Sequence, residues 1–181
     1  YNGNKNFPRD FVKIFQKIST LRLTVLTFGI IKKKKKEEKT MNYEKITQKS
    51  AECLQNAQRI ALENGNQEIT SLHILNALIN DNEGIISQIL SELKVNLDKL
   101  AKDITNEIAN LPKIHPLNQA YFSSETEQML NLAQNIANQM KDEYVSVEHI
   151  FLAILEKGDK KTKDILSRNN INRNDFIKEL A

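Results

Sequence analysis

The sequence predicts an all-α domain of eight helices that follows a basic leader, and three observations support this fold class. Aromatic residues make up 6% of the 181 residues, and glycine (5) and proline (3) are scarce, which argues against turn-rich β architectures. In the body of the chain, apolar residues recur at the three- and four-residue spacing of amphipathic helices. The body also contains two copies of one pattern, offset by 76 residues.

The two copies keep their register without a gap. The offset aligns five pairs of segments: 54–61 with 130–137, 69 with 145, 73–77 with 149–153, 89–91 with 165–167, and 95–96 with 171–172. Coincidence would not hold this register over so many segments. Because four short helices bury little apolar surface alone, we expect the two halves to dock about a pseudo-twofold axis and to leave a groove along their seam.

Each copy predicts four helices, and capping residues mark where they begin. In copy one the first helix covers residues 47–64 and ends before Gly65. Glycine is common just after a helix because it readily adopts the left-handed conformation that ends the helix. Its other three helices start after these residues: Thr70 or Ser71, Gly84, and Asn96. In copy two the helices open at Ser123 or Ser124, at Ser146, in the loop marked by Gly158, and at Asn172.

A connector separates the two copies. Pro112 and Pro116 deny the chain a helix there, so residues 110–122 are expected to be extended. The predicted organisation is therefore a leader over residues 1–40 and a double repeat over residues 41–181. The repeat comprises residues 47–109, the connector, and residues 123–180.

Charge is concentrated in the leader. The chain has 26 Lys+Arg and 23 Asp+Glu, but residues 1–40 carry a net charge of +8 and residues 41–181 carry −5. An acidic body cannot neutralise a run of phosphates, so nucleic-acid binding by the body is disfavoured. The apolar stretch at residues 21–31 has about half of the roughly 20 residues that a membrane crossing needs. No stable membrane span is therefore expected.

The leader has three interpretations. It has no acidic residue between Asp10 and Glu37, and this cationic pattern resembles an organelle transit segment. That interpretation predicts a plastid or mitochondrial location, with a cytoplasmic location as the alternative. The leader is otherwise an extension upstream of a start at Met41, or a basic arm that acts on membranes or nucleic acids.

The sequence contains no recognisable catalytic or metal-binding motif. It lacks the G-x-x-x-x-G-K-[ST] pattern, so this chain is not expected to hydrolyse ATP. Its single cysteine excludes an internal disulfide and a four-cysteine zinc site. Cys53 lies on an apolar stripe and is interpreted as a small buried residue. His73 and His149 occupy equivalent positions, so we interpret them as packing residues rather than zinc ligands.

Carboxylates gather at the start of the second helix of copy two, where Asp142, Glu143 and Glu148 stand. Two interpretations remain open. The acids stabilise the helix N-terminus, by roughly 0.3–1 kcal/mol, or they hold a cationic or amide group of a bound chain while Leu130 and Val145 supply apolar contact. The corresponding residues of copy one are neutral: Asn66, Gln67 and Leu72. This difference favours a role beyond capping.

The duplicated segments resemble a known family. ITSLHILNAL (69–78) and YVSVEHIFLAI (144–154) are similar to the double Clp repeat that forms the amino-terminal domain of Clp ATPases. The resemblance covers residues 43–180 in order, spacing and duplication. Residues 43–47, 66–69 and 111–113 are more similar to the ClpB disaggregases than to the protease-linked ClpA or ClpC.

The resemblance implies a non-enzymatic domain that precedes two AAA+ ATPase modules in a hexamer. The domain would engage unfolded or aggregated polypeptide, and the whole protein would work with a co-chaperone system. It implies no cofactor for this chain, and ATP and Mg for the downstream modules. It places substrate contact at Thr47, Asp142 and Glu148, while His149 stands where some relatives carry an apolar residue. Two alternatives remain: an adaptor-docking domain of a ClpC-like protease unfoldase, and a basic membrane or nucleic-acid adaptor that acts through residues 1–40.

Overall fold

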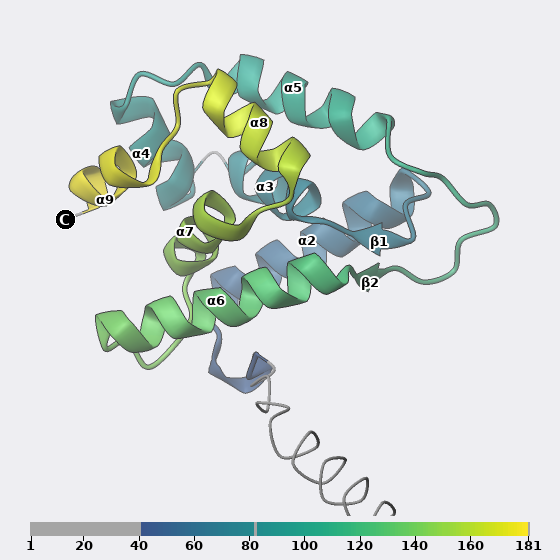
Figure 1. Ribbon diagram of the computed structural model, residues 1–181. Coiled ribbons are helices and arrows are strands. Elements are labelled where there is room, and N and C mark those ends of the chain that lie inside the picture. The colour runs from purple at the N-terminus through teal and green to yellow at the C-terminus, as the bar shows by residue number, and fades with distance from the viewer. Residues whose placement is uncertain (1–40, 82, 181) are drawn as a thin grey trace, which may run out of the picture. The chain divides into compact units, whose positions relative to one another are not determined.

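The computed structural model describes residues 41–81 and 83–180, so the predicted leader lies outside the described residues. The described part contains eight α-helices, which confirms the predicted all-α fold. None of these helices is long and apolar enough to cross a membrane. In chain order the elements are η1 (Tyr43–Lys45), α2 (Gln48–Glu63), β1 (Glu68–Ile69), α3 (Ser71–Ile79), α4 (Ile85–Glu92), α5 (Leu97–Ala109), β2 (Tyr121–Phe122), α6 (Ser124–Met140), α7 (Val147–Lys157), α8 (Lys160–Arg168) and α9 (Arg173–Leu180) (Figure 1).

The first helix of each copy begins at a hydroxyl cap. The Oγ1 atom of Thr47 accepts a hydrogen bond from the Ser50 backbone N–H, and Ser123 Oγ accepts one from Thr126 N–H, both at 3.2 Å. Each cap satisfies a backbone donor that the first turn of a helix leaves without a partner. The predicted helix starts at these positions are therefore confirmed.

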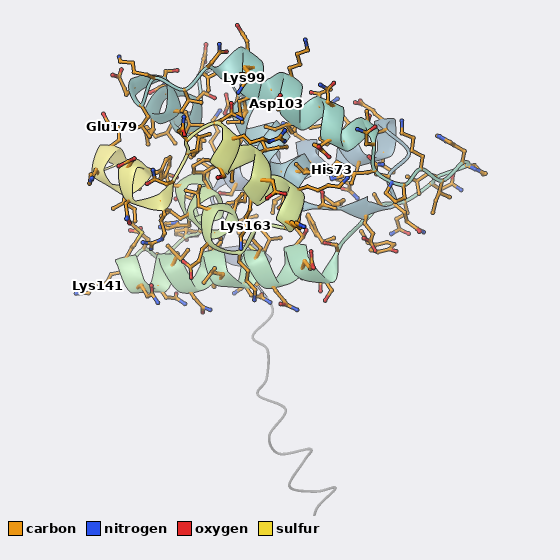
Figure 2. The ribbon with its side chains drawn as sticks, turned by 45° about the horizontal axis from the view of Figure 1, so that its top comes forward. His73, Lys99, Asp103, Lys141, Lys163 and Glu179 are labelled. Atoms are coloured by element: carbon orange, nitrogen blue, oxygen red, sulfur yellow. The ribbon has the colours of Figure 1, made fainter. Side chains whose placement is uncertain are left out.

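The first helices of the two copies also end in the same way, but with different residues. Gly65, at φ +73°, follows α2, and Lys141, at φ +66°, follows α6. The next residues, Asn66 and Asp142, donate their backbone N–H groups back to Ala61 and Ala137. Glycine adopts the left-handed conformation freely, whereas a side chain there costs roughly 1–2 kcal/mol. Copy two therefore carries backbone strain at the end of α6, where Figure 2 shows Lys141.

Helices α3 and α7 form the centre of the double repeat. Every residue of α3 is buried. Helix α3 contacts α2, α4, α5, α7 and α8, and α7 contacts α6, α2, α4, α8 and α9. The rings of Phe151 and Phe176 meet with their centroids 4.6 Å apart and join α7 to α9. The second helix of each copy is thus the core element around which the others pack.

The outer helices of the two copies pack reciprocally. Helix α4 contacts α9, and α8 contacts α5 (Figure 1). The 76-residue offset equates α4 with α8 and α5 with α9, so these two contacts are the same contact made twice. Such a reciprocal pair of contacts is the arrangement that a pseudo-twofold axis produces.

Short extended segments also cross between the copies. Strand β1 pairs in parallel with β2, and Ile46 forms an isolated parallel bridge with Val145. The offset equates the two pairings, because Ile69 corresponds to Val145 and Phe122 to Ile46. The segment before the first helix of each copy therefore pairs with the segment before the second helix of the other copy. The sequence did not predict these strands, since two-residue strands show no hydrophobic alternation.

Candidate functional site

The structure joins two of the predicted site residues, Thr47 and Val145, through their backbones. Thr47 N–H donates to the Val145 carbonyl oxygen (3.0 Å), and Val145 N–H donates to the Lys45 carbonyl oxygen (2.9 Å). Ser50 Oγ also donates to the Val145 carbonyl oxygen (2.9 Å). Thr47 is half-buried and caps α2. Its position therefore connects the start of copy one to the loop before α7.

The side chains of Leu130 and Val145 lie in the hydrophobic core. Both are 0% exposed. They support this part of the surface from beneath, and in this structure they offer no side-chain surface to a bound chain. The apolar groove wall predicted at these two positions is therefore not present, because the faces of α6 and of the loop that carry them turn inward.

Exposed apolar surface at this end of copy two comes from other residues. Met140, the last residue of α6, is 47% exposed, and Tyr144 is 48% exposed. They lie on either side of Asp142 in the chain. Neither residue is among those predicted from the sequence to contact substrate, although an aromatic residue in an acidic loop between two helices is a signal that points to Tyr144.

Asp142 is held by a buried histidine. The Asp142 side chain is 54% exposed, and its Oδ2 atom lies 3.0 Å from Nε2 of His149. The Nδ1 atom of His149 accepts the backbone N–H of Ser146 (3.0 Å), which closes the first turn of α7. Glu148 is half-buried in the same turn. The structure thus places Asp142 and Glu148 at the N-terminus of α7, where a carboxylate is favoured.

Copy one builds the same frame from neutral groups. His73 Nδ1 accepts the backbone N–H of Thr70 (3.0 Å), and Nε2 lies 3.2 Å from Oδ1 of Asn66. Burial lowers the pKa of His73 from 6.5 to about 4, because the charged imidazolium loses its hydration. His73 therefore remains neutral at physiological pH, in agreement with a packing role.

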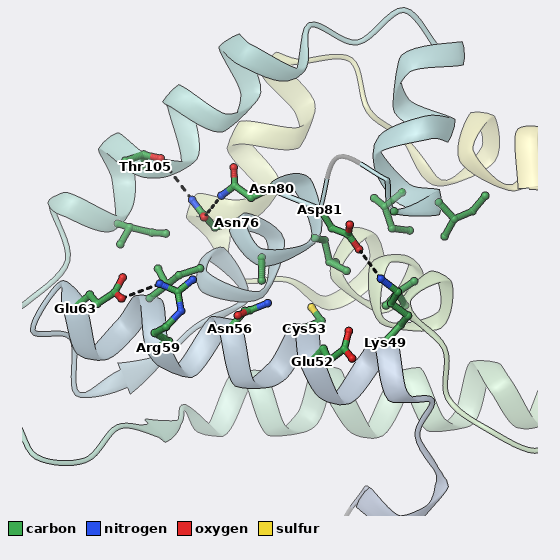
Figure 3. Close-up of a pocket in the computed structure, with 18 of the residues that line it drawn as sticks. Lys49, Glu52, Cys53, Asn56, Arg59, Glu63, Asn76, Asn80, Asp81 and Thr105 are labelled. Carbon is green, nitrogen blue, oxygen red and sulfur yellow. Dashed lines mark hydrogen bonds and ion pairs between the residues drawn. The ribbon is translucent and has the colours of Figure 1, made fainter.

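A hollow of about 570 Å³ lies within copy one (Figure 3). Among the described residues, its lining comes from α2, α3, α4, α5 and the loops that follow α2 and α3, and copy two contributes Val147. Two ion pairs stand on its rim: Lys49–Asp81 (3.8 Å) and Arg59–Glu63 (2.7 Å). This hollow is thus located inside one repeat rather than along the predicted seam.

Comparison of the two copies explains the hollow. Asn56 and Asn76 line it, where copy two has the larger apolar residues Leu132 and Leu152. Cys53 stands where copy two has Met129. Burial, and secondly the nearby Asp81 carboxylate, raise the pKa of the Cys53 thiol to about 12. A protonated thiol is a poor nucleophile, so Cys53 supplies no covalent chemistry here.

A second hollow, of about 510 Å³, does lie along the seam. Thr70, Leu72 and Ser123 are among the residues that line it. Their counterparts under the 76-residue offset are Ser146, Glu148 and Thr47. The predicted site and this hollow therefore occupy equivalent positions related by the pseudo-twofold axis. Where the predicted site has the acidic Glu148, the hollow has the apolar Leu72.

The chain belongs to a known protein family. The profile of the family described as the Clp repeat (R) N-terminal domain matches residues 45–169. The chaperone protein ClpB of Clostridium perfringens is 35% identical over 147 residues, which cover 77% of this chain and 17% of that protein. The ClpB of Rhodopirellula baltica is 33% identical over 76% of this chain and 16% of its own length. The chain thus spans about one sixth of the curated relatives it matches.

Solved structures share the fold. The Hsp104 N-terminal domain of Candida albicans superimposes with a TM-score of 0.67 at 23% identity, over 75% of this chain and 88% of that one. A ClpV N-domain solved in complex with a VipB peptide gives a TM-score of 0.61 at 20% identity, over 76% of this chain and 86% of that one. At these identities the likeness concerns the fold alone.

Proposed function

Because the chain belongs to the family of Clp repeat N-terminal domains, we propose that residues 41–180 are the substrate-engaging domain of a ClpB-like, ATP-dependent protein disaggregase. In this proposal the domain binds unfolded or aggregated polypeptide. ATP and Mg bind to AAA+ modules elsewhere in a hexameric protein, which works with a co-chaperone system. The cationic composition of residues 1–40 supports an organelle location, in a plastid or a mitochondrion.

The observation that carries the proposal is the exposure of Met140 and Tyr144 on either side of Asp142. Unfolded chains expose apolar side chains that folded proteins bury, and two half-exposed apolar residues provide a matching surface. The half-exposed carboxylate adds an acceptor for a backbone N–H, a lysine or an arginine. The ClpV N-domain that shares this fold was solved with a peptide, which agrees with a polypeptide-binding role.

A binding measurement tests the proposal. The ligand is a fluorescein-labelled, reduced and alkylated protein that cannot fold, and affinity is read from fluorescence anisotropy. We expect the double variant Met140→Ser, Tyr144→Ser to bind roughly tenfold more weakly, because about 60 Å² of apolar contact area contributes about 1.5 kcal/mol. Ile114→Ser, at a residue that is 44% exposed on the connector, is the matched control and should bind as the wild type does. Equal affinity of the double variant and the wild type would exclude this surface.

A further inference from the structure

Each copy contains one buried histidine, whose two ring nitrogens face partners at fixed distances along the chain. Nδ1 lies 3.0 Å from a backbone nitrogen three residues earlier, in Thr70 or Ser146. Nε2 faces the side chain seven residues earlier, Asn66 in copy one and Asp142 in copy two. The geometry is therefore duplicated, but the residue that faces Nε2 is an amide in one copy and an acid in the other.

The backbone partner fixes where the ring proton lies. A backbone N–H only donates, so the Nδ1 atom that it reaches must be an unprotonated acceptor. The neutral ring then carries its proton on Nε2 and donates it to the oxygen that it faces. In copy two that acceptor is Oδ2 of Asp142, at 3.0 Å. His149 thus acts as a donor aimed at the carboxylate.

The two copies use this donor differently. Asn66 is 2% exposed, and its Nδ2 donates to the Pro112 carbonyl oxygen (3.0 Å), so both ends of the amide are engaged inside the domain. Asp142 is 54% exposed. Within residues 41–81 and 83–180, its side chain makes one hydrogen bond, between Oδ2 and Nε2 of His149. Copy two therefore leaves Oδ1, the second oxygen of this half-exposed carboxylate, without a hydrogen-bond partner among the described residues.

We propose that His149 is a positioning residue of the candidate site: its Nε2–H fixes Asp142 so that Oδ1 accepts a lysine or arginine side chain of the bound polypeptide. The proposal rests on the proposed function. The backbone before Asp142 supports it, because Lys141 is held in the left-handed conformation and the loop therefore carries strain. A hydrogen bond from the buried ring to Asp142 opposes relaxation of that loop and limits the rotamers of the carboxylate.

Two amide substitutions separate the two contacts of the ring. Glutamine places an amide nitrogen near the position of Nε2, so His149→Gln keeps a donor to Asp142 and loses the acceptor for Ser146 N–H. Asparagine places an amide oxygen near Nδ1, so His149→Asn keeps that acceptor and loses the donor. The probes are two short fluorescein-labelled peptides of leucine and tyrosine, one with interspersed lysines and one with glutamines in their place.

We expect His149→Asn to bind the lysine peptide roughly three- to tenfold more weakly, as the loss of one hydrogen bond predicts, and His149→Gln to bind it within about twofold of the wild type. The glutamine peptide should not distinguish the two variants. In the wild type, a long-range ¹H–¹⁵N spectrum should show the proton of both histidines, His73 and His149, on Nε2. A purely structural role of His149 would affect both peptides equally.

Two outcomes would overturn the positioning role: equal affinities of the Asn and Gln variants for the lysine peptide, or a proton on Nδ1 of His149. Asp142→Ala separates this failure from failure of the proposed function, because it leaves the buried ring in place. If Asp142→Ala weakens binding while the two His149 variants bind equally, only the positioning role is wrong. If Asp142→Ala binds both peptides as the wild type does, the proposed site itself is wrong.

Discussion

Ser71 and Asp159 are hydrogen-bonded to each other twice across the junction of the two repeats. Ser71 Oγ donates to Asp159 Oδ2 (2.5 Å) and accepts the Asp159 backbone N–H (3.0 Å). Thr162 Oγ1 lies 2.8 Å from the same serine oxygen. Under the 76-residue offset the first two residues correspond to Val147 and Glu83, and a valine side chain cannot form such bonds. The starts of α3 and α8 are therefore linked by polar contacts. The equivalent helices, α7 and α4, do not repeat these contacts.

Ser71→Ala should lower the free energy of unfolding by about 1–2 kcal/mol, because the Asp159 backbone N–H loses its hydrogen bond to the buried Ser71 hydroxyl, which is 2% exposed. Urea denaturation followed by circular dichroism measures the change. Ser91→Ala is the matched control, since Ser91 is exposed and its side chain donates only to the Ser87 carbonyl oxygen, within α4. An unchanged urea midpoint for Ser71→Ala would show that this network does not stabilise the junction.

Lys141→Gly should raise the free energy of unfolding by about 1 kcal/mol, because glycine removes the cost of a side chain in the left-handed conformation. Gly65→Ala, at the equivalent position of copy one, should destabilise the fold. An added Cβ at Gly65 would stand 2.8 Å from the His115 ring, in addition to the backbone strain. Thermal unfolding of the two variants provides the comparison. A lower melting temperature for Lys141→Gly would contradict the strain argument.

Leu130→Asp should prevent stable folding, because it places a carboxylate without a partner in the core, where Leu130 is 0% exposed. We expect a loss above about 4 kcal/mol. Tyr144→Asp, at a half-exposed position, should keep the helical circular dichroism of the wild type. A folded Leu130→Asp protein would show that this part of α6 opens to solvent.

Acidification should destabilise the domain through His73. Its pKa is about 4 in the folded chain and 6.5 as the reference value, so between these values the unfolded chain binds a proton that the folded chain excludes. Stability therefore falls as pH decreases from 6.5 towards 4, by at most about 1.4 kcal/mol per pH unit from this group. His73→Gln keeps a donor to Asn66 and does not titrate. Urea unfolding at pH 7 and pH 5 should show a drop about 2 kcal/mol larger in the wild type than in this variant.

Removal of residues 1–40 should leave binding of an unfolded protein unchanged, because the candidate site lies entirely in residues 41–180. A basic arm acting on membranes or nucleic acids would instead lose its binding on truncation, and that binding would fall steeply with salt. Anisotropy measured with and without the leader, at low and at physiological salt, distinguishes the two. Loss of binding to the unfolded protein on truncation would favour the basic arm.

The helices could be predicted from the sequence because the information that defines them is local. Thr47, Asn96 and Ser123 mark helix starts by their own side chains, and apolar spacing marks the faces between them. Long-range features could not be predicted in this way. The crossed strands are too short to show a pattern, and the burial of Leu130 depends on which side of α6 meets its neighbours. The hollow of copy one required a comparison of side-chain volumes between the copies, at Asn56 and Leu132.

The crossed pairing of Ile46 with Val145 and of β1 with β2 has a consequence for how the domain assembles. Neither repeat contains all of the backbone partners that its own leading segment requires, so a fragment ending in the connector should remain unfolded. Such a fragment should regain structure when the complementary fragment is added. Two intact chains at high concentration could also exchange repeats through the connector, which would give an intertwined dimer with the same contacts.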